Sequence, residues 1–271
     1  MDRQALTDQF RVLHVPGTPL VMPNPWDIGS AKVMAGLGAK ALATTSAGYG
    51  FTRGLPDGAQ LSRDQALAHA AEICTAVDLP VNGDFENGFG DDPDTVADTV
   101  RLAAQAGLAG VSIEDTVVPG TGAYPFDLAL ARIKAAIAAA KEVGIVLTAR
   151  ADGWLMGGYD QAEALRRCQA FATAGADVIY APGVDVDTTR ALIATGTPVN
   201  LLATGDMRDL SVAEMASLGV ARISIGGGLA RVAQRALIDG TRAMLEQGDF
   251  TILNGAAASA VVDDLMRGPQ T

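Results

Sequence analysis

Short apolar segments recur along the chain, and an alanine-rich stretch with helical periodicity follows most of them. The apolar segments are nearly continuous rather than alternating, which is typical of parallel strands whose outer face is covered by helices. Successive segments are separated by roughly the length of a loop and an amphipathic helix. We therefore predict eight strands, at residues 20–23, 41–45, 80–84, 110–114, 145–149, 177–180, 198–202 and 222–225.

The stretches between these segments carry helix signals. Residues 63–77 and 93–106 have helical periodicity, and Asp92 or Asp94 is placed to cap the second helix. Five glycines stand where a helix would end before the next strand, at Gly107, Gly144, Gly175, Gly196 and Gly219. Eight such units favour an α/β fold of the (β/α)8 TIM-barrel type, and an open doubly wound sheet is the alternative.

No linker or change in composition divides the chain, so we predict one domain over residues 1–271. The barrel is expected over about 15–245, followed by a C-terminal helical extension at about 255–268. With 49% hydrophobic and 19% charged residues, intrinsic disorder is excluded.

The net charge and the small number of histidines and cysteines exclude several kinds of function. A formal charge of −11 repels phosphate backbones and anionic lipid, so we expect neither a nucleic-acid nor a membrane partner. No leader-like or membrane-spanning segment is evident, which favours the reducing environment of the cytoplasm. His14, His69, Cys74 and Cys168 are too few and too scattered for a zinc site or a Ser-His-Asp triad. We assign these four residues to structure or surface.

Acidic side chains gather where predicted strands end, which is where barrel enzymes place their active sites. Asp84 and Glu86 are two residues apart, so an extended segment would point them to the same side, and Glu114 ends the next strand. Three converging carboxylates repel one another unless a cation lies between them. Oxygen donors suit Mg²⁺, with Mn²⁺ as a substitute. The alternative is that these acids pair with arginines such as Arg150 or cap helices.

Other polar groups at the same edge are candidates for binding an acid. Arg150 offers a two-pronged donor for a carboxylate or phosphate, or else a structural salt bridge. Ser46, with the backbone amides of Ala47 and Gly48, could hold a carboxylate or enolate oxygen, or could form a plain tight turn.

Several further positions carry weaker signals. Asp57 lies in a Pro-Asp-Gly turn, and Asn200 in the seventh strand is added as a substrate-binding candidate. The Gly- and Pro-rich segment 117–125 is typical of a mobile lid, in which Tyr124 either reaches the site or anchors the loop. The glycines within 225–229 could bind phosphate through their amides or could ease helix packing.

Taken together, these segments resemble the isocitrate lyase/phosphoenolpyruvate mutase superfamily over roughly residues 15 to 240. The motifs that carry the resemblance are NPWDIGSAK from Asn24, TSAGYG from Thr45, LPDG from Leu55, VNGDFENGFG from Val81, GVSIED from Gly110 and TARAD from Thr148. The acidic residues occur in the order that this superfamily has around its barrel, so the combination of these motifs is specific to it.

The resemblance implies a barrel with three Mg²⁺ ligands, directly or through water: Asp84, Glu86 and Glu114. It implies that Ser46 and the two following amides cradle an α-keto acid, with Asp57 beside the waters of the metal and Arg150 on a second anionic group. The family usually has Asp where Glu86 stands. Members commonly exchange the last helix between subunits, which here would be 256–266, so a homodimer or homotetramer is expected.

The lid differs from those of well-known members. Isocitrate and methylisocitrate lyases carry a Lys-Lys/Arg-Cys-Gly-His lid, whereas residues 116–125 contain no Cys, Lys or His. The polar lid residues of the phosphonomutases, notably Asn, are also missing. The resemblance therefore implies a Mg²⁺-dependent lyase that breaks a C–C bond, by decarboxylation or retro-aldol cleavage, in a small 2-oxo or 2-hydroxy dicarboxylate.

The expected intermediate is a pyruvate-type enolate, protonated by a water at the metal or by Tyr124. One alternative is a phosphonopyruvate or carboxyphosphonoenolpyruvate mutase or hydrolase that acts on a P–C bond. The other is a non-catalytic protein that binds a dicarboxylate.

Overall fold

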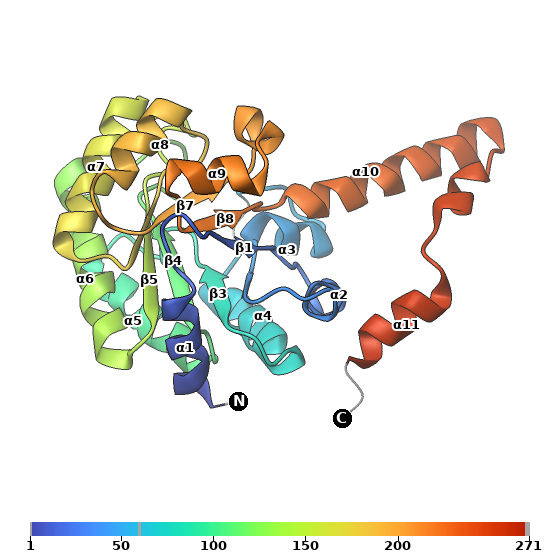
Figure 1. Cartoon of the computed structure of the whole chain (residues 1–271), viewed down its shortest axis with the longest axis horizontal. Coiled ribbons are helices and arrows are strands. Elements are labelled where there is room, and N and C mark those ends of the chain that lie inside the picture. The colour runs from blue at the N-terminus through green and yellow to red at the C-terminus, as the bar shows by residue number, and fades with distance from the viewer. Residues whose placement is uncertain (1, 59–60, 269–271) are drawn as a thin grey trace.

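Eight parallel strands form one curved sheet in the computed structural model, which describes residues 2–58 and 61–268 (Figure 1). The strands are β1 (Leu20–Met22), β2 (Leu42–Ala43), β3 (Val81–Asp84), β4 (Gly110–Glu114), β5 (Val146–Arg150), β6 (Val178–Tyr180), β7 (Val199–Leu202) and β8 (Arg222–Ser224). All eight lie at the positions predicted from the apolar runs.

The sheet is a nearly closed barrel. Its order is β1-β8-β7-β6-β5-β4-β3-β2, so β1 and β2 come last at its two ends. Two hydrogen bonds join these ends: the Ala43 amide donates to the Pro23 carbonyl at 3.1 Å, and Asn24 Nδ2 donates to the Thr44 carbonyl at 3.2 Å. The predicted TIM-barrel type is therefore confirmed, and the open-sheet alternative is wrong.

Helices follow the strands and cover the outside of the barrel (Figure 1). They are α1 (Arg3–Val12), α2 (Ile28–Gly36), α3 (Ser46–Thr52), α4 (Arg63–Ala76), α5 (Pro93–Gln105), α6 (Phe126–Val143), α7 (Gln161–Ala174), α8 (Val186–Ile193), α9 (Val212–Leu218), α10 (Gly228–Arg242) and α11 (Ser259–Arg267). Short helical turns occupy η1 (Gly205–Asp209), η2 (Ala243–Gln247) and η3 (Thr251–Gly255). None of the helices in the described ranges is long and apolar enough to cross a membrane.

The predicted helix ends are borne out by backbone geometry. Asp92 caps α5, because its side chain accepts a hydrogen bond from the Asp94 amide at 3.2 Å. Gly144, Gly175 and Gly219 end α6, α7 and α9 with φ angles of 78°, 98° and 98°. This left-handed conformation costs glycine little, which explains its recurrence ahead of the strands.

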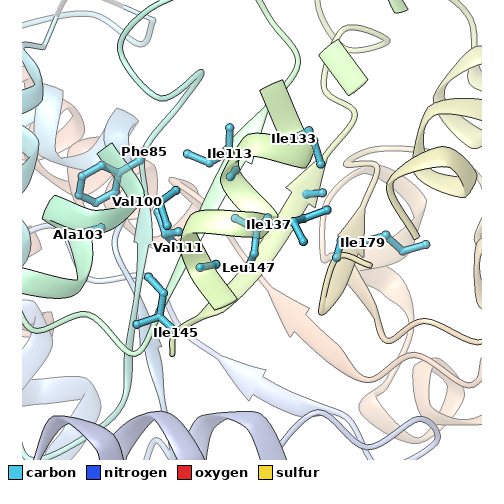
Figure 2. Close-up of a cluster of buried hydrophobic side chains, with 14 of the residues drawn as sticks. Phe85, Val100, Ala103, Val111, Ile113, Ile133, Ile137, Ile145, Leu147 and Ile179 are labelled. Carbon is cyan, nitrogen blue, oxygen red and sulfur yellow. The ribbon is translucent and has the colours of Figure 1, made fainter. Parts of the chain in front are cut away.

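The main hydrophobic core lies between the sheet and its helices. Figure 2 shows Val111 and Ile113 of β4 and Leu147 of β5 packed among Ile133 and Ile137 of α6, all of them buried. These strands alternate apolar residues outward with polar residues inward. This packing fixes the positions of the strands, and their other face lines the inside of the barrel.

The amino-terminal end of the barrel is closed by α1, a helix that the sequence analysis did not predict. Phe10 of α1 is fully buried and packs with Leu20, Val146 and Val178 inside the barrel. The sequence around Phe10 is mostly polar, so its pattern does not indicate a buried helix. The single side chain of Phe10 fills the amino-terminal end of the barrel. This apolar plug closes the amino-terminal end, and the polar inward positions lie above it.

The C-terminal extension leaves the barrel as a separate arm (Figure 1). Its last helix, α11, lies within the predicted range 255–268 and packs on α2, where Lys32 Nζ donates to the Met266 carbonyl at 3.0 Å. A side chain at Gly36 would meet Leu265, so the two helices approach closely. Exchange of this helix between subunits and the single-domain organisation stay predictions.

Candidate active site

A cavity of about 470 Å³ opens at the carboxyl ends of the strands. Eight of the ten predicted site residues line it: Ser46, Ala47, Asp57, Asp84, Glu86, Glu114, Arg150 and Asn200. Gly48 and Tyr124 are not among the lining residues. The fold thus brings together side chains that are far apart in the sequence, because parallel strands present their carboxyl ends at one edge.

Arg150, at the end of β5, lies at the centre of the acidic groups. Its Nη1 is 2.5 Å from Asp84 Oδ1, and its Nη2 is 3.0 Å from Glu114 Oε2. Asp152 receives two further bonds, at 3.0 Å from Nε and 2.6 Å from Nη2. The guanidinium is therefore a counter-ion to three carboxylates, which is the salt-bridge alternative, and its role as a clamp for substrate stays a prediction.

Asp84 is held in place by the segment after β2. The Ser46 amide and Oγ both donate to Asp84 Oδ2 at 2.9 Å, and the Asp84 amide donates to Thr44 Oγ1 at 2.8 Å. The Gly48 amide donates to Oγ1 of Thr45, the N-cap residue of α3, at 3.3 Å. Helix capping thus uses the Gly48 amide, and the cradle of Ser46 with the Ala47 and Gly48 amides stays a prediction.

Glu86 reaches the cavity by a turn rather than along a strand. β3 ends at Asp84, and Glu86 has a φ of 46°, so the predicted extended geometry is wrong. Its side chain nevertheless lines the same cavity as Asp84 and is buried. Burial, and secondly the negative charge of Asp84, raise the pKa of Glu86 to about 7.

Glu114 and Asp152 are likewise buried without enough positive charge nearby to hold their pKa values low. Thr116 Oγ1 donates to Glu114 Oε1, yet burial raises the pKa of Glu114 in spite of Arg150. Burial raises the pKa of Asp152 in the same way. Five carboxylates of the described residues line the cavity against three arginines, and only Arg150 among these arginines is paired with any of the five, so the chemistry of the donor set fits a hard divalent cation.

No three acidic, histidine or cysteine side chains within residues 2–58 and 61–268 are arranged to hold an ion by themselves. Mg²⁺ usually retains several waters and needs only one or two carboxylates, so this geometry agrees with a hydrated ion. The assignment of Asp84, Glu86 and Glu114 as its ligands stays a prediction.

A buried network behind Arg150 escaped the sequence analysis. Asp115 is fully buried and accepts from the Asp152 amide at 2.9 Å, from Tyr159 Oη at 2.7 Å and from Arg167 Nη1 at 2.8 Å. Asp115 thereby positions Asp152, which in turn holds Arg150. The Glu114-Asp115 pair was noted in the sequence, but alternation along a strand points the second acid away from the cavity.

Tyr124, for which a catalytic role is predicted, is hydrogen-bonded to residues outside the cavity lining, and that role stays a prediction. Its hydroxyl donates to Asp91 Oδ1 at 2.5 Å and accepts from Asn87 Nδ2 at 3.0 Å. Its ring lies 4.0 Å beneath the guanidinium carbon of Arg132. Tyr124 therefore anchors the 117–125 loop, while Val118 of that loop lines the cavity.

Three amides of the glycine segment after β8 are already hydrogen-bonded within the protein. Asn24 Oδ1 accepts from the amides of Ile225 and Gly226, both at 3.0 Å, and the Gly228 amide donates to the Ile225 carbonyl. These bonds favour the packing interpretation over a phosphate site. Asn24 was quoted in the NPWDIGSAK motif without a role, and it also links β1 to the Thr44 carbonyl.

The two histidines are structural, as expected. His69 stacks on Tyr49 with ring centroids 3.9 Å apart and contacts the Trp26 carbonyl at 2.9 Å. His14 is buried in the floor of the barrel beside Phe10. Cys168 is fully buried and Cys74 is half-buried.

Comparisons with known proteins show the family and the fold of the chain. The sequence profile described as phosphoenolpyruvate phosphomutase matches residues 10–245. An oxaloacetate decarboxylase of Paraburkholderia xenovorans is 30% identical over 263 residues, 93% of this chain and 86% of its own. A crystal structure of a lyase/mutase candidate from Burkholderia cenocepacia J2315 has a TM-score of 0.90 and 43% identity, covering 96% of this chain and 95% of that one.

An oxaloacetate acetylhydrolase with its product oxalate bound has a TM-score of 0.84 and 25% identity, and the match covers 97% of this chain and 94% of that one. The superfamily contains lyases and mutases that act on small dicarboxylates and on phosphonopyruvate, and its members typically use Mg²⁺. Because the family profile spans most of its length, the chain belongs to the isocitrate lyase/phosphoenolpyruvate mutase superfamily.

Proposed function

We propose that the protein is a Mg²⁺-dependent lyase that cleaves a C–C bond in a small 2-oxo or 2-hydroxy dicarboxylate. Decarboxylation of a 2-oxo acid would leave a pyruvate-type enolate, whereas retro-aldol cleavage of a 2-hydroxy acid would leave the carbanion on the departing carboxylic acid. The observation that carries the proposal is the group of buried carboxylates around Arg150 in a cavity large enough for such an acid. Two of its relatives are named for reactions of oxaloacetate, one a decarboxylase and one an acetylhydrolase. Oxaloacetate is therefore the first substrate to test.

The carboxylates of Asp84, Glu86 and Glu114 would hold the ion. A bound Mg²⁺ would supply Lewis-acid stabilisation of the negative charge that develops on the 2-oxo acid. Arg150 keeps the carboxylates together in the absence of substrate and provides a cation beside the bound acid. Ser46 keeps Asp84 oriented, which preserves the geometry needed for charge stabilisation.

The lid limits the chemistry. Tyr124 is committed to Asp91 and Asn87, and residues 116–125 contain no cysteine or histidine to donate a proton. Protonation of the enolate then falls to water that enters the cavity. Decarboxylation suits this site, because its departing group is CO₂ and no second carbon acid needs a proton.

Cleavage of a P–C bond is the second candidate, since the matching profile is described as a phosphomutase. The two reactions are separated by their products. Purified protein with Mg²⁺ is incubated with oxaloacetate, with alkylmalates and with phosphonopyruvate, and pyruvate and phosphate are measured separately. We expect pyruvate from oxaloacetate above the metal-only rate and no phosphate from phosphonopyruvate.

Asp84→Asn is the matched test of the site. We expect kcat/KM to fall by about 10²-fold or more, the usual effect of losing one charge-stabilising group, with an unchanged circular dichroism spectrum. Asp94→Asn, in the exposed first turn of α5, is the control and should keep full activity. Release of phosphate alone would favour the P–C enzyme, and tight binding without turnover of any acid would indicate a non-catalytic protein.

A further inference from the structure

An arginine at the floor of the cavity has no acidic partner. Arg222, in β8, lines the cavity with only 2% of its surface exposed. Its Nε donates to Asn200 Oδ1 at 2.8 Å, and its Nη1 lies 3.3 Å from His14 Nε2. No carboxylate from residues 2–58 or 61–268 forms an ion pair with it. Burial lowers the pKa of Arg222 to about 9, so the guanidinium stays charged at neutral pH.

The two neighbours of Arg222 do not neutralise this charge. His14 Nδ1 lies 2.8 Å from the Phe10 carbonyl, so Nδ1 carries the proton and Nε2 accepts from the guanidinium. Burial lowers the pKa of His14 to about 3, which keeps the ring uncharged. Asn200 is uncharged and donates from its own Nδ2 to Ser224 Oγ at 2.8 Å. The positive charge is thus buried without compensation.

Arg132 is also buried without an ion pair to any described residue, but it lies outside the cavity lining, and its guanidinium donates to the Gly90 and Asn87 carbonyls and lies over the Tyr124 ring. The remaining buried arginines have acidic partners. Arg150 contacts three carboxylates, and Arg167 contacts Asp115 and Glu163. Arg231 also lines the cavity, but its side chain is exposed and can be hydrated. A buried charge without a partner destabilises the folded protein. Such destabilising groups are usually found at functional sites. Here the charge faces an open cavity rather than a packed core.

A second polar group at the cavity also lacks a partner. Asn82 Oδ1 is buried and has no hydrogen bond within the described part of the chain. Buried polar atoms are nearly always satisfied by protein, water or ligand. Asn82 Oδ1 is an acceptor, so a water or a hydroxyl group would satisfy it, and the preference for an anion rests on the charge of Arg222 alone.

We propose that Arg222 binds the distal carboxylate of the substrate and so selects dicarboxylates over monocarboxylates. This inference rests on the proposed function, because it takes the acids at the strand ends as the place of the reacting end. Arg222 lies one inward-facing position below Ser224, towards the amino end of β8, whereas Asp84, Glu114 and Arg150 lie at the carboxyl ends of their strands. A four-carbon diacid would reach from those acids to the floor, where the guanidinium offers the planar donor pair that suits a carboxylate.

Equilibrium binding tests the proposal without requiring turnover. Isothermal titration calorimetry with Mg²⁺ present compares malate with 2-hydroxybutyrate, which has the same hydroxy-acid end but no distal carboxylate. We expect the wild type to bind malate about tenfold or more tightly than 2-hydroxybutyrate, as charge-assisted recognition of a second carboxylate allows. Arg222→Met should abolish that preference and leave the affinity for 2-hydroxybutyrate unchanged. Arg222→Lys should keep part of the preference.

Arg190→Met, an exposed arginine of α8 that pairs with Asp187, is the matched control and should keep the preference for malate. Arg231→Met tests whether the exposed arginine of the cavity carries the preference instead. The proposal is overturned if the wild type shows no preference, if Arg222→Met retains it or weakens both ligands equally, or if Arg231→Met loses it instead. A thermal melt of the ligand-free protein checks folding, and we expect the Tm of Arg222→Met to be unchanged or raised. Selective binding of malate without turnover would support Arg222 while contradicting the lyase.

Discussion

At the scale of single residues, Arg150 determines whether the acidic site is stable before any ligand arrives. Its side chain is 15% exposed and separates Asp84, Glu114 and Asp152. Arg150→Met leaves these buried carboxylates unpaired, so we expect the free energy of unfolding to fall by about 3–5 kcal/mol. Urea denaturation measures the loss. Mg²⁺ should restore more stability to this variant than to the wild type, and equal effects of Mg²⁺ on both proteins would contradict a shared cation at these acids.

The buried His14 makes stability depend on pH. Burial, with Arg222 as the next cause, lowers its pKa from 6.5 to about 3, so between these values the unfolded chain binds a proton that the folded protein excludes. The free energy of unfolding should therefore fall as pH drops below 6.5, by at most about 1.4 kcal/mol per unit for this one proton. Urea unfolding between neutral pH and mild acid, compared with His14→Gln, isolates the effect. An identical pH dependence in the variant would refute it.

At the scale of an element, α7 supports the site through one of two adjacent arginines. Arg167 is 6% exposed and pairs with the buried Asp115, whereas Arg166 is 53% exposed and pairs with Glu163 on the surface. Arg167→Met should lower the free energy of unfolding by about 3–5 kcal/mol, because Asp115 keeps a buried charge. Arg166→Met should change it by about 1 kcal/mol or less. Chemical denaturation measures the free energy of unfolding of both variants. Comparable losses in the two would mean that Asp115 does not depend on α7.

At the scale of the whole molecule, the C-terminal arm leaves an apolar surface uncovered. Val232 and Leu237 of α10 and Leu245 of η2 are 64%, 62% and 82% exposed. Exposed apolar side chains of this kind mark an interface, so we expect a homodimer or homotetramer in solution. Light scattering should show the double variant Leu237→Glu, Leu245→Glu as a monomer and the control Arg235→Ala as the wild-type assembly. A wild type that is monomeric at micromolar concentration would exclude this role for the arm.

Local patterns in the sequence were enough to predict much of the architecture. The eight strands, the glycine helix ends and the acids at the strand ends were all predictable, because each depends on a short stretch of chain. The strand register then brings any residue at a strand's carboxyl end to the same cavity. The helix α1 was missed because its contribution is a single buried side chain, Phe10.

The partners of each polar group were decided only by the tertiary structure. Asp84 and Arg150 are 66 positions apart, and their pairing follows from the closure of the barrel. The turn at Glu86, the hydrogen bond of Tyr124 to Asp91 and the unpaired charge of Arg222 likewise depend on the tertiary structure. Hydrophobic periodicity and helix capping act over a few residues, so a sequence reveals them directly. Ion pairing and burial depend on which strands and loops meet, and no local pattern contains that information.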